Sequence, residues 1–531
     1  MILNKNRIIF ILILFIAVVL RFFYLSHDSL YGDEPAYLVR SMGWHDSLGS
    51  NLQSTPAQWF DSVPWWSNLS FHDHPPLVFA VNKVSFSLFG DSLFVGRLPS
   101  AIFSLLTVVL IFLIASKLFD RQTGLIAMFI FSVNDFVLVY SRRGMMESVS
   151  LFFILLTLYF FILALKNKKY LYLFGVGMGL SLLAKYVSLF MVPVYLLTLI
   201  IYKRDYLVKK ELYYSLLIAV VIFSPVLLYN YYLYITVGHF DLQFSYLFGQ
   251  DTPQWSSLIG KENIGGLQNR VSNWKHLFFN FSIPMSILTV ISIGFAVWQV
   301  KMKNYKQAIN YCFMLFSFIS LFLLTLVIGS DDRFIYYSLP FLIIMISCFL
   351  SHVLSYKKNS KLVFIAIVIF AVYELFFSIN TNIVSALTSP IGLKHVMYSS
   401  RSSSDSDKYQ LLDKFVQETS KTNSYIIFDP RIQPRAYLWT FARRQFYENK
   451  TFFTTYNLLT EMENIAKNHS GQIKFSLVPV TSNSKIANTL FPALSLIILG
   501  FIFLPNNELA KLSGCTLLAS TVSLNSLLLP V

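Results

Sequence analysis

Charge is scarce in this chain. Only 13% of its 531 residues are Asp, Glu, Lys or Arg, whereas soluble globular proteins carry about 25%. A soluble enzyme, a disordered protein and a nucleic-acid-binding module are therefore excluded as descriptions of the whole chain. Cysteine is scarce as well. Cys312, Cys348 and Cys515 lie far apart in apolar runs, which excludes a disulfide framework and a cysteine-based metal or redox motif. The sequence also has no Gly-rich phosphate-binding loop and no solenoid or heptad repeat.

Hydrophobic residues are abundant instead, at 55% of the chain. A membrane-spanning helix needs about 20 apolar residues. The first apolar run, Ile8 to Phe23, follows Lys5 and Arg7 and has no small-residue cleavage site after it, so we expect an uncleaved anchor. With the tail 489–531, which we interpret as two short spans or a hairpin, the apolar runs predict an α-helical polytopic membrane protein of about 11–13 transmembrane helices. The remaining runs lie at about 98–116, 124–140, 148–165, 171–184, 187–202, 212–232, 277–300, 308–328, 334–353 and 362–380.

Lysine and arginine predict the orientation of these helices. The net charge is +15, and basic residues gather at the N-terminus and in alternate connections. The positive-inside rule makes that side cytoplasmic. We therefore expect a multi-pass protein of the cell membrane with a cytoplasmic N-terminus, surrounded by membrane lipids and binding no nucleic acid. The basic connections contain Lys117 and Arg121; Lys166, Lys168 and Lys169; Lys203, Arg204, Lys209 and Lys210; Lys301, Lys303 and Lys306; and Lys357, Lys358 and Lys361.

The opposite side receives the long polar segments. These are a first outer loop at about 26–96, a loop at about 233–276 and the region 381–488. We expect residues 1–380 to form the transmembrane domain and residues 381–488 to form a small extracytoplasmic α/β domain. Its expected parts are a linker at Ser400–Ser406, helices at Tyr409–Val416 and Leu458–Ala466, and a strand at Tyr425–Asp429.

Ionisable residues close to the apolar layer are the best functional candidates in a membrane protein. The first outer loop opens with Tyr31-Gly32-Asp33-Glu34-Pro35, a few residues after the first apolar run. One interpretation is a hydrated helix start, because Asp followed by Glu-Pro is favourable first-turn chemistry. The other is a catalytic site at Asp33 and Glu34, since partial loss of water beside lipid brings a carboxyl group toward the range of a general base.

The same loop ends with His72-Asp73-His74-Pro75-Pro76. The simplest interpretation is a rigid, extended entry into the next helix. Two histidines and an aspartate also suggest a metal site, although an extended segment would point His72 and His74 to opposite sides. A divalent metal ion is therefore left open, with Asp73, His74 and His239 as the candidate ligands, and no other cofactor is indicated.

Basic residues at the outer ends of several spans run against the positive-inside bias, so topology does not explain them. They are Arg142 and Arg143 in one short connection, Lys185 in an otherwise apolar run, and Arg333 in Asp331-Asp332-Arg333-Phe334-Ile335-Tyr336-Tyr337. Together with Asp33 they suit a phosphate-headed lipid that reacts with a hydroxyl group. The cations would hold the phosphate and neutralise its charge as it leaves, and the carboxylate would take the proton.

For two further charged residues, Arg97 and Glu147, we expect simple structural roles. Arg97 opens an apolar run, and we expect its side chain to reach the membrane interface. Glu147 follows Arg143 by four residues, and we expect the two to pair across a helix turn.

Several of these motifs resemble, in their order along the chain, those of the GT-C glycosyltransferases, in the protein O-mannosyltransferase and aminoarabinose transferase-like group. The order is an acidic pair after the first span, His-Pro-Pro, Phe-Gly-Asp-Ser, Arg-Leu-Pro-Ser, and Tyr-Ser-Arg followed by an acid. The run from Gly175 to Lys185 is similar to that group's Gly-rich span ending in Lys. The resemblance covers about 1–200, continues loosely to about 350 and then fades.

The resemblance implies a GT-C-like transmembrane domain that transfers a sugar, with inversion, from a polyprenyl-phosphate donor to an acceptor outside the cytoplasm. The acceptor is a protein, a lipid or a glycan. By the match, Asp33 is the catalytic base and Glu34 its partner. The lipid phosphate would lie among Arg142 or Arg143, Lys185 and Arg333, and the site would be lined by Asp73, His74, Glu147 and Tyr336.

The same residues also admit other functions. A transporter or flippase of lipid-linked sugars also has many spans and buried charges, but transporters usually hold ions near the midplane on broken helices. A structural or assembly protein would leave Asp33 and the cations without a role. An oligosaccharyltransferase would usually carry a Trp-Trp-Asp-Tyr-Gly-type motif in its outer domain. None is present, and Trp65-Trp66 lies in the first loop.

Overall fold

The structure is a computed structural model that describes the chain in segments. These are residues 5–26, 30, 32–46, 55–56, 60, 62–250, 281–302, 305–327, 332–355, 360–378, 413–414, 425–428, 439–440, 443–444 and 451–454. The chain divides into two compact units. One comprises Met1–Ser424 and Arg435–Thr451, and the other comprises Tyr425–Pro434 and Phe452–Val531.

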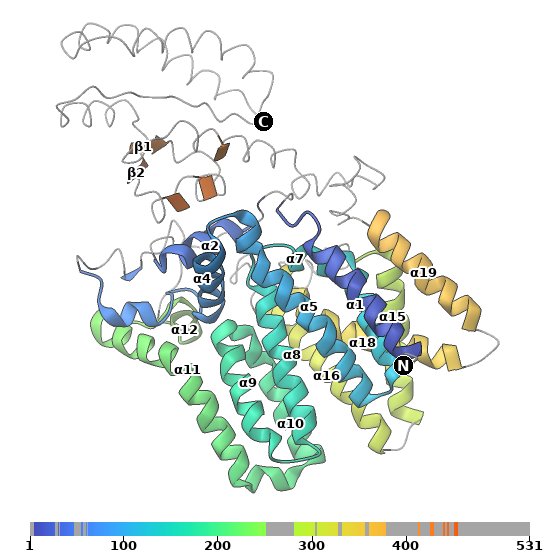
Figure 1. Cartoon of the computed structure of the whole chain (residues 1–531). Helices are drawn as coiled ribbons and strands as arrows, with labels where there is room; N and C mark the ends of the chain where they lie inside the picture. The colour runs from blue at the N-terminus through green and yellow to red at the C-terminus, as the bar shows by residue number, and fades with distance from the viewer. Residues whose placement is uncertain are drawn as a thin grey trace, which may run out of the picture. The chain divides into compact units, whose positions relative to one another are not determined.

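The described part of the first unit is almost entirely helical (Figure 1). After the first helix, two helices of the first outer loop lie together at one end of the unit, and longer helices extend away from them. In chain order the first elements are α1 (Lys5–Phe22), α2 (Glu34–Gly43), the 3-10 helix η1 (Trp65–Leu69), α4 (Leu77–Phe89), α5 (Leu93–Leu118), α6 (Arg121–Val133), α7 (Asp135–Ser141), α8 (Glu147–Ala164) and α9 (Tyr170–Ala184).

The second half of the unit continues the bundle with apolar helices. The elements are η2 (Tyr186–Met191), α10 (Val192–Tyr202), η3 (Arg204–Val208), α11 (Lys210–Val237), α12 (Leu242–Leu247), α15 (Ile283–Met302), α16 (Tyr305–Val327), α17 (Asp332–Ile335), α18 (Leu339–Ser355) and α19 (Ser360–Phe376). Each apolar run expected before residue 381 therefore contains a helix.

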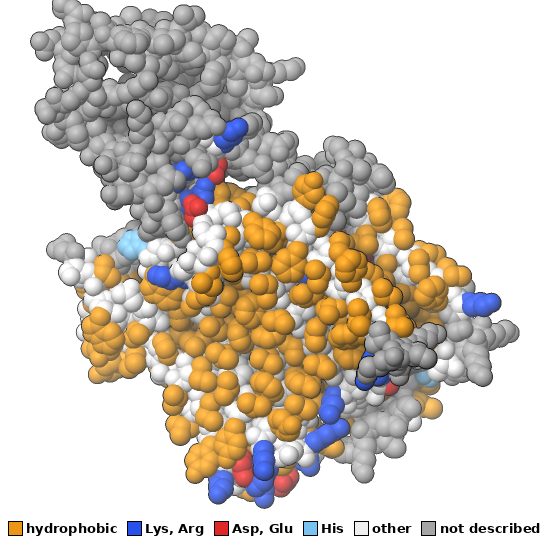
Figure 2. Space-filling model, in the orientation of Figure 1, with side chains coloured by type: hydrophobic (Ala, Val, Ile, Leu, Met, Phe, Trp, Pro, Cys, Tyr) orange, Lys and Arg blue, Asp and Glu red, His pale blue; other side chains and the backbone are white. Residues whose placement is uncertain are grey.

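The apolar helices form a membrane domain. Within the described residues, five are long and apolar enough to cross a membrane, or six if α6 and α7 count as one bent span. Apolar side chains cover the flank of the unit, as Figure 2 shows. Lys and Arg side chains gather at the lower end, away from α2 and α4. A helix that is apolar all round needs lipid or protein on every side, so this surface faces the bilayer.

The bent span breaks at Asn134, where α6 and α7 meet at 65°. The Asn134 side chain caps α7 by accepting the Val137 N–H at 3.1 Å. The last carbonyls of α6 are bound by a buried arginine of α1: Arg21 donates to Phe131 O and Ser132 O, each at 3.3 Å. These bonds satisfy backbone groups that a broken helix would leave unpaired within the membrane.

Glycine allows a close contact between α9 and α11. A Cβ atom on Gly175 of α9 would lie 2.2 Å from the backbone oxygen of Ser215 in α11. A Cβ atom on Gly179 would lie 2.7 Å from Ile222, one turn further on. These helices therefore pack backbone against backbone, as small residues permit in membrane proteins.

The second unit is described only in part. Tyr425–Phe428 (β1) and Thr451–Thr454 (β2) form a two-stranded sheet. The strand coincides with the one expected at Tyr425–Asp429, but the expected α/β domain stays a prediction. The expected linker at Ser400–Ser406, the helix at Leu458–Ala466 and the tail 489–531 lie outside the described residues.

Candidate active site

Helix α2 positions the central carboxylate. Asp33 occupies the N-cap position of α2, but its side chain makes no capping hydrogen bond. Its Oδ2 instead accepts from Nη1 of Arg333 at 2.7 Å. The Asp33 side chain is 48% exposed and that of Arg333 18%. The residue at the helix start is thus turned toward a cation that lies 300 positions away in the sequence.

One face of α2 continues from this carboxylate. Tyr37 lies one turn after Asp33, and side chains at i and i+4 share a helix face. The Tyr37 hydroxyl lies 3.4 Å from Oδ2 of Asp33 and 3.2 Å from Nε2 of His74. Burial, followed by the charge of Asp33, raises the pKa of Tyr37 well above its usual value. The hydroxyl therefore stays protonated and connects the aspartate with the histidine.

Arg40, on the same face of α2, holds the His-Asp-His loop. It donates to the two carboxylate oxygens of Asp73 at 3.1 and 2.6 Å, and it also binds Asp46. Asp73 in turn lies 3.1 Å from Nδ1 of His74. Burial opposes the charge of Asp73, but Arg40 and His74 hold its pKa well below the ordinary value. Burial raises the pKa of Asp46 to about 6.

These contacts do not favour a metal at the expected ligands. Both oxygens of Asp73 are engaged by Arg40, and His74 faces Tyr37. His239 lies beside His72 instead, with ring centroids 5.9 Å apart. Among the residues that the structure describes, no group of three or more His, Cys, Asp or Glu side chains could hold a metal ion. The donor set therefore does not fit a metal, and we derive no step through one.

Glu34 points away from Asp33, into the protein. It is completely buried and accepts from Nε and Nη2 of Arg97 at 2.7 and 2.9 Å, and from the Gly144 N–H at 2.7 Å. Burial opposes its charge, but Arg97 holds the pKa of Glu34 below its usual value. The expectation that Arg97 reaches the membrane interface is therefore wrong, because its guanidinium is needed inside to balance Glu34.

The two arginines of the connection after α7 differ in their contacts. Arg142 donates to the last carbonyls of α1 and the turn after it, including Leu20 O at 3.0 Å and Phe23 O at 2.7 Å. It is buried and serves as a cap for α1. Arg143 is also buried, and its charge acts on Glu34. The hydrogen bonds of Arg142 described above thus lead to α1 and the turn after it, whereas Arg333 contacts Asp33.

Lys185 and Glu147 form the second ion pair of the site. Lys185 follows the last residue of α9, and its Nζ donates to Oε1 of Glu147, the first residue of α8, at 2.8 Å. The expected pairing of Glu147 with Arg143 is thus wrong, since the α9 terminus supplies a nearer cation. Lys185 Nζ lies 5.8 Å from the centre of the Phe334 ring, and the Arg333 guanidinium lies 5.2 Å from the same ring.

The residues after α17 support this arrangement from inside. Tyr336 is completely buried, and its hydroxyl lies 3.2 Å from Ser148 Oγ. The neighbouring Tyr337 lies 3.0 Å from Ser150 Oγ, and Lys185 Nζ lies over its ring at 5.6 Å. Tyr336 is therefore packed below the site, whereas Tyr337 contacts the lysine.

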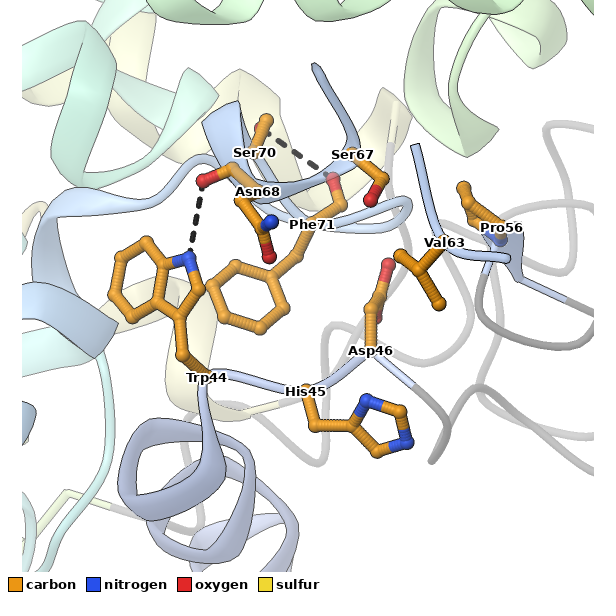
Figure 3. Close-up of a pocket in the computed structure, with 9 residues that line it drawn as sticks. All are labelled: Trp44, His45, Asp46, Pro56, Val63, Ser67, Asn68, Ser70 and Phe71. Atoms are coloured by element: carbon orange, nitrogen blue, oxygen red, sulfur yellow. Dashed lines mark hydrogen bonds between the residues drawn. The ribbon is translucent and has the colours of Figure 1, made fainter. Parts of the chain in front are cut away.

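A small pocket lies at the other end of α2. It borders Asp46, so it adjoins the chain of contacts that runs through Arg40 (Figure 3). Figure 3 shows the Trp44 indole on one side, with its N–H donating to Asn68 O at 3.0 Å. The pocket is lined by Trp44, His45, Asp46, Pro56, Val63, Ser67, Asn68, Ser70 and Phe71.

Sequence reasoning missed Tyr37, Arg40 and Asp46. A signal was present for the first two, because Asp33, Tyr37 and Arg40 follow the i, i+4, i+7 spacing of one helix face. Asp46 had no such signal, since its contact with Arg40 depends on how the loop turns after α2.

The sequence between α4 and α11 matches a known family. Residues 73–229 match the family model described as dolichyl-phosphate-mannose-protein mannosyltransferase. This match includes His74, Glu147 and Lys185. No curated protein sequence matches the chain significantly.

Solved structures share the fold at low sequence identity. ArnT from Cupriavidus metallidurans in the apo state aligns with a TM-score of 0.57 at 12% identity, over 92% of this chain and 95% of that one. The same protein bound to undecaprenyl phosphate gives 0.54 at 13% identity, over 86% and 88%. The oligosaccharyltransferase of Archaeoglobus fulgidus in the apo form gives 0.50 at 14% identity, over 85% of this chain and 65% of that one. The chain thus shares the fold of ArnT, and its residues 73–229 are similar to the mannosyltransferase family.

Proposed function

We propose that this protein is a membrane glycosyltransferase that moves a sugar from a polyprenyl-phosphate donor to a hydroxyl group of an extracytoplasmic acceptor. One observation carries the proposal: a half-exposed carboxylate, Asp33, lies against Arg333, and Arg333 and Lys185 flank the same aromatic ring. A base and two cations at one end of a membrane domain are the groups that such a transfer needs. The family match and the undecaprenyl phosphate bound to ArnT support the donor class.

The two cations would receive the phosphate of the donor. Arg333 and Lys185 lie far apart in the sequence, yet both cations lie within 6 Å of the centre of the Phe334 ring. Arg offers a planar set of donors to phosphate oxygens, and Lys adds a point charge. Their charge would stabilise the phosphate as the bond to the sugar breaks. Arg142 is occupied by α1 carbonyls, so we do not assign it to the phosphate.

Asp33 would act as the general base. It would take the proton of the acceptor hydroxyl, whose oxygen then forms a bond to the anomeric carbon. The bond between that carbon and the phosphate oxygen breaks at the same time, and the lipid phosphate leaves with the electron pair. Attack opposite to the leaving phosphate inverts the anomeric centre. Positioning and electrostatic stabilisation supply most of the rate in such a displacement.

Tyr37 and His74 would keep Asp33 in place. Their contacts connect Asp33 with Asp73 and Arg40, and a base is effective only within hydrogen-bond reach of its proton. Glu34 would contribute indirectly, because its bonds to Arg97 and Gly144 fix the first turn of α2.

The proposal includes the orientation that the basic connections favour. The N-terminus and the lower, basic end of the unit would be cytoplasmic, and α2 would lie at the outer surface. The region 381–488 would then contribute to acceptor choice as an extracytoplasmic α/β domain. The sugar is not specified by the site, and mannose is the first candidate because of the family match.

The test is sugar transfer by the purified protein from a panel of radiolabelled polyprenyl-phosphate sugars, with membranes as acceptor and with or without EDTA. Asp33→Asn should lower turnover by about a hundredfold or more, the scale of a lost general base. Asp205→Asn is the matched control, because Asp205 is an exposed aspartate in η3. Equal turnover in Asp33→Asn and the wild type would refute the assignment of the base. Loss of turnover in EDTA would show that a metal is needed after all.

A further inference from the structure

Each of the two cations assigned to the phosphate already has a carboxylate partner. Nη1 of Arg333 lies 2.7 Å from Asp33 Oδ2, and Nζ of Lys185 lies 2.8 Å from Glu147 Oε1. Both distances are those of direct, charge-assisted hydrogen bonds. In this state the positive charge of each cation is therefore balanced by its carboxylate partner.

The two pairs are close enough to act as one unit. Phe334 lies against both cations, and the Tyr37 hydroxyl is influenced by Asp33, Arg333 and Glu147 together. A phosphate that contacts Arg333 and Lys185 would therefore meet both carboxylates. Like charges at such distances repel strongly where water is partly excluded.

The Glu147 pair is the more enclosed of the two. The Glu147 side chain is completely buried and Lys185 is 11% exposed. Oε2 of Glu147 has no hydrogen-bond partner within the described part of the chain. A buried carboxylate with one oxygen unsatisfied is costly to keep, so the pair between Glu147 and Lys185 is not optimised as a structural bond.

We infer that the donor phosphate displaces Asp33 from Arg333 and Glu147 from Lys185 when it binds, so that Asp33 is released as a base only once the donor is in place. This inference rests on the proposed function. A carboxylate bound to a guanidinium is a weaker base than the same carboxylate without it. The ion pairs thus keep the site neutral and its base inactive until the lipid phosphate replaces them.

The inference predicts the direction in which phosphate binding changes, and a purely supporting role predicts a different direction. If the carboxylates compete with the phosphate, removing their charge makes phosphate binding tighter. If they only orient the cations for the phosphate, removing their charge leaves binding unchanged or weaker. The measurement uses a polyprenyl phosphate without sugar, so it does not depend on turnover.

The experiment is equilibrium binding of undecaprenyl phosphate to the purified full chain in nanodiscs. Asp33→Asn should bind about twofold to fivefold more tightly than the wild type, the range for a partly exposed ion pair. Glu147→Gln should tighten binding by about tenfold or more, provided that its thermal stability matches the wild type. Arg333→Gln should weaken binding. Glu211→Gln is the matched control, because Glu211 pairs with Lys168 at 2.7 Å in the basic connections.

The outcomes separate the inference from the proposed function. Tighter binding by Asp33→Asn, with Glu211→Gln unchanged, supports the exchange even if Glu147→Gln proves unstable. Equal or weaker binding by Asp33→Asn overturns the exchange and leaves the proposed function intact. Equal tightening by Glu211→Gln also overturns it, because the effect would then be one of net charge. If the wild type itself binds no undecaprenyl phosphate, the proposed function fails and the inference fails with it.

Discussion

Arg97 and Glu34 form an ion pair from which water is completely excluded, with N–O distances of 2.7 and 2.9 Å. Glu34 is the residue directly after Asp33. The pair therefore ties the first turn of α2 to α5, and Gly144 adds a third bond to the same carboxylate. We infer that the orientation of Asp33 depends on this buried contact.

The first prediction concerns the stability of that pair. Arg97→Met should destabilise the protein by about 3–5 kcal/mol, because it leaves the buried Glu34 carboxylate without its cation. The double variant Glu34→Gln with Arg97→Met should lose less than the two single variants added together, since no charge is then left unpaired. Thermal unfolding in detergent provides the measurement. Additive losses would show that the two side chains are not coupled.

The second prediction concerns the link between Asp33 and His74. Tyr37→Phe keeps the buried ring but removes the hydroxyl that lies 3.4 Å from Asp33 and 3.2 Å from His74. We expect kcat to fall by about threefold to tenfold, with little change in KM, because a neutral hydrogen bond contributes about 1 kcal/mol. Tyr213→Phe is a suitable comparison, since Tyr213 is an exposed tyrosine of α11. An unchanged kcat would mean that the hydroxyl does not position the base.

The third prediction is a pH dependence that starts from His72. Burial lowers the pKa of His72 to about 4, from about 6.5 in an unfolded chain. The folded state therefore binds a proton less readily, and the stability that the neutral ring contributes is present above pH 6.5 and is lost as the pH falls toward 4.

Replacement of His72 should remove this component. We expect the difference in melting temperature, His72→Gln minus wild type, to increase steadily as the pH is lowered from 7 to 5. At pH 5 the difference corresponds to about 2 kcal/mol at most. Parallel melting curves across this range would show that His72 titrates normally in the folded protein.

The fourth prediction tests the contact between α9 and α11. Gly175→Ala would place a Cβ atom 2.2 Å from the backbone oxygen of Ser215, so the helices must separate. We expect a loss of about 1–3 kcal/mol, the range for an overpacked contact. Gly294→Ala is the matched control, because nothing lies within 4 Å of the added Cβ in α15. The control should be neutral or slightly stabilising, and equal losses in both variants would point to the lipid environment instead.

Much of the membrane fold could be predicted from the sequence, because long apolar runs have few alternatives to a spanning helix. The expected run at 124–140 illustrates the limit. It was expected to be one continuous span, yet it bends by 65° at Asn134. A single Asn within an apolar run does not reveal whether another helix supplies the donors that a break requires, and here Arg21 supplies them.

The sequence could predict which charged residues are candidates for the site, but not which of them contact one another. Asp33 and Lys185 stood out because charges are rare near the apolar layer. The sequence did not distinguish Arg333, which contacts Asp33, from Arg142, which caps α1. Both are arginines at the end of an apolar run, and only the three-dimensional arrangement of helices decides which one meets a carboxylate and which one meets carbonyl groups.

Arg21 and Arg142 also bear on how the membrane domain is assembled. Arg21 of α1 binds the broken end of α6, and Arg142, after α7, binds the end of α1. Besides Ala17 in its own helix and Ser104 of α5, the Arg21 guanidinium reaches acceptors more than a hundred residues away, as does that of Arg142. Arg21 lies in the last turn of α1, and a cation near lipid is unfavourable unless protein groups bind it. We infer that the final position of α1 depends on α6 and α7, so that these three helices assemble together in the bilayer.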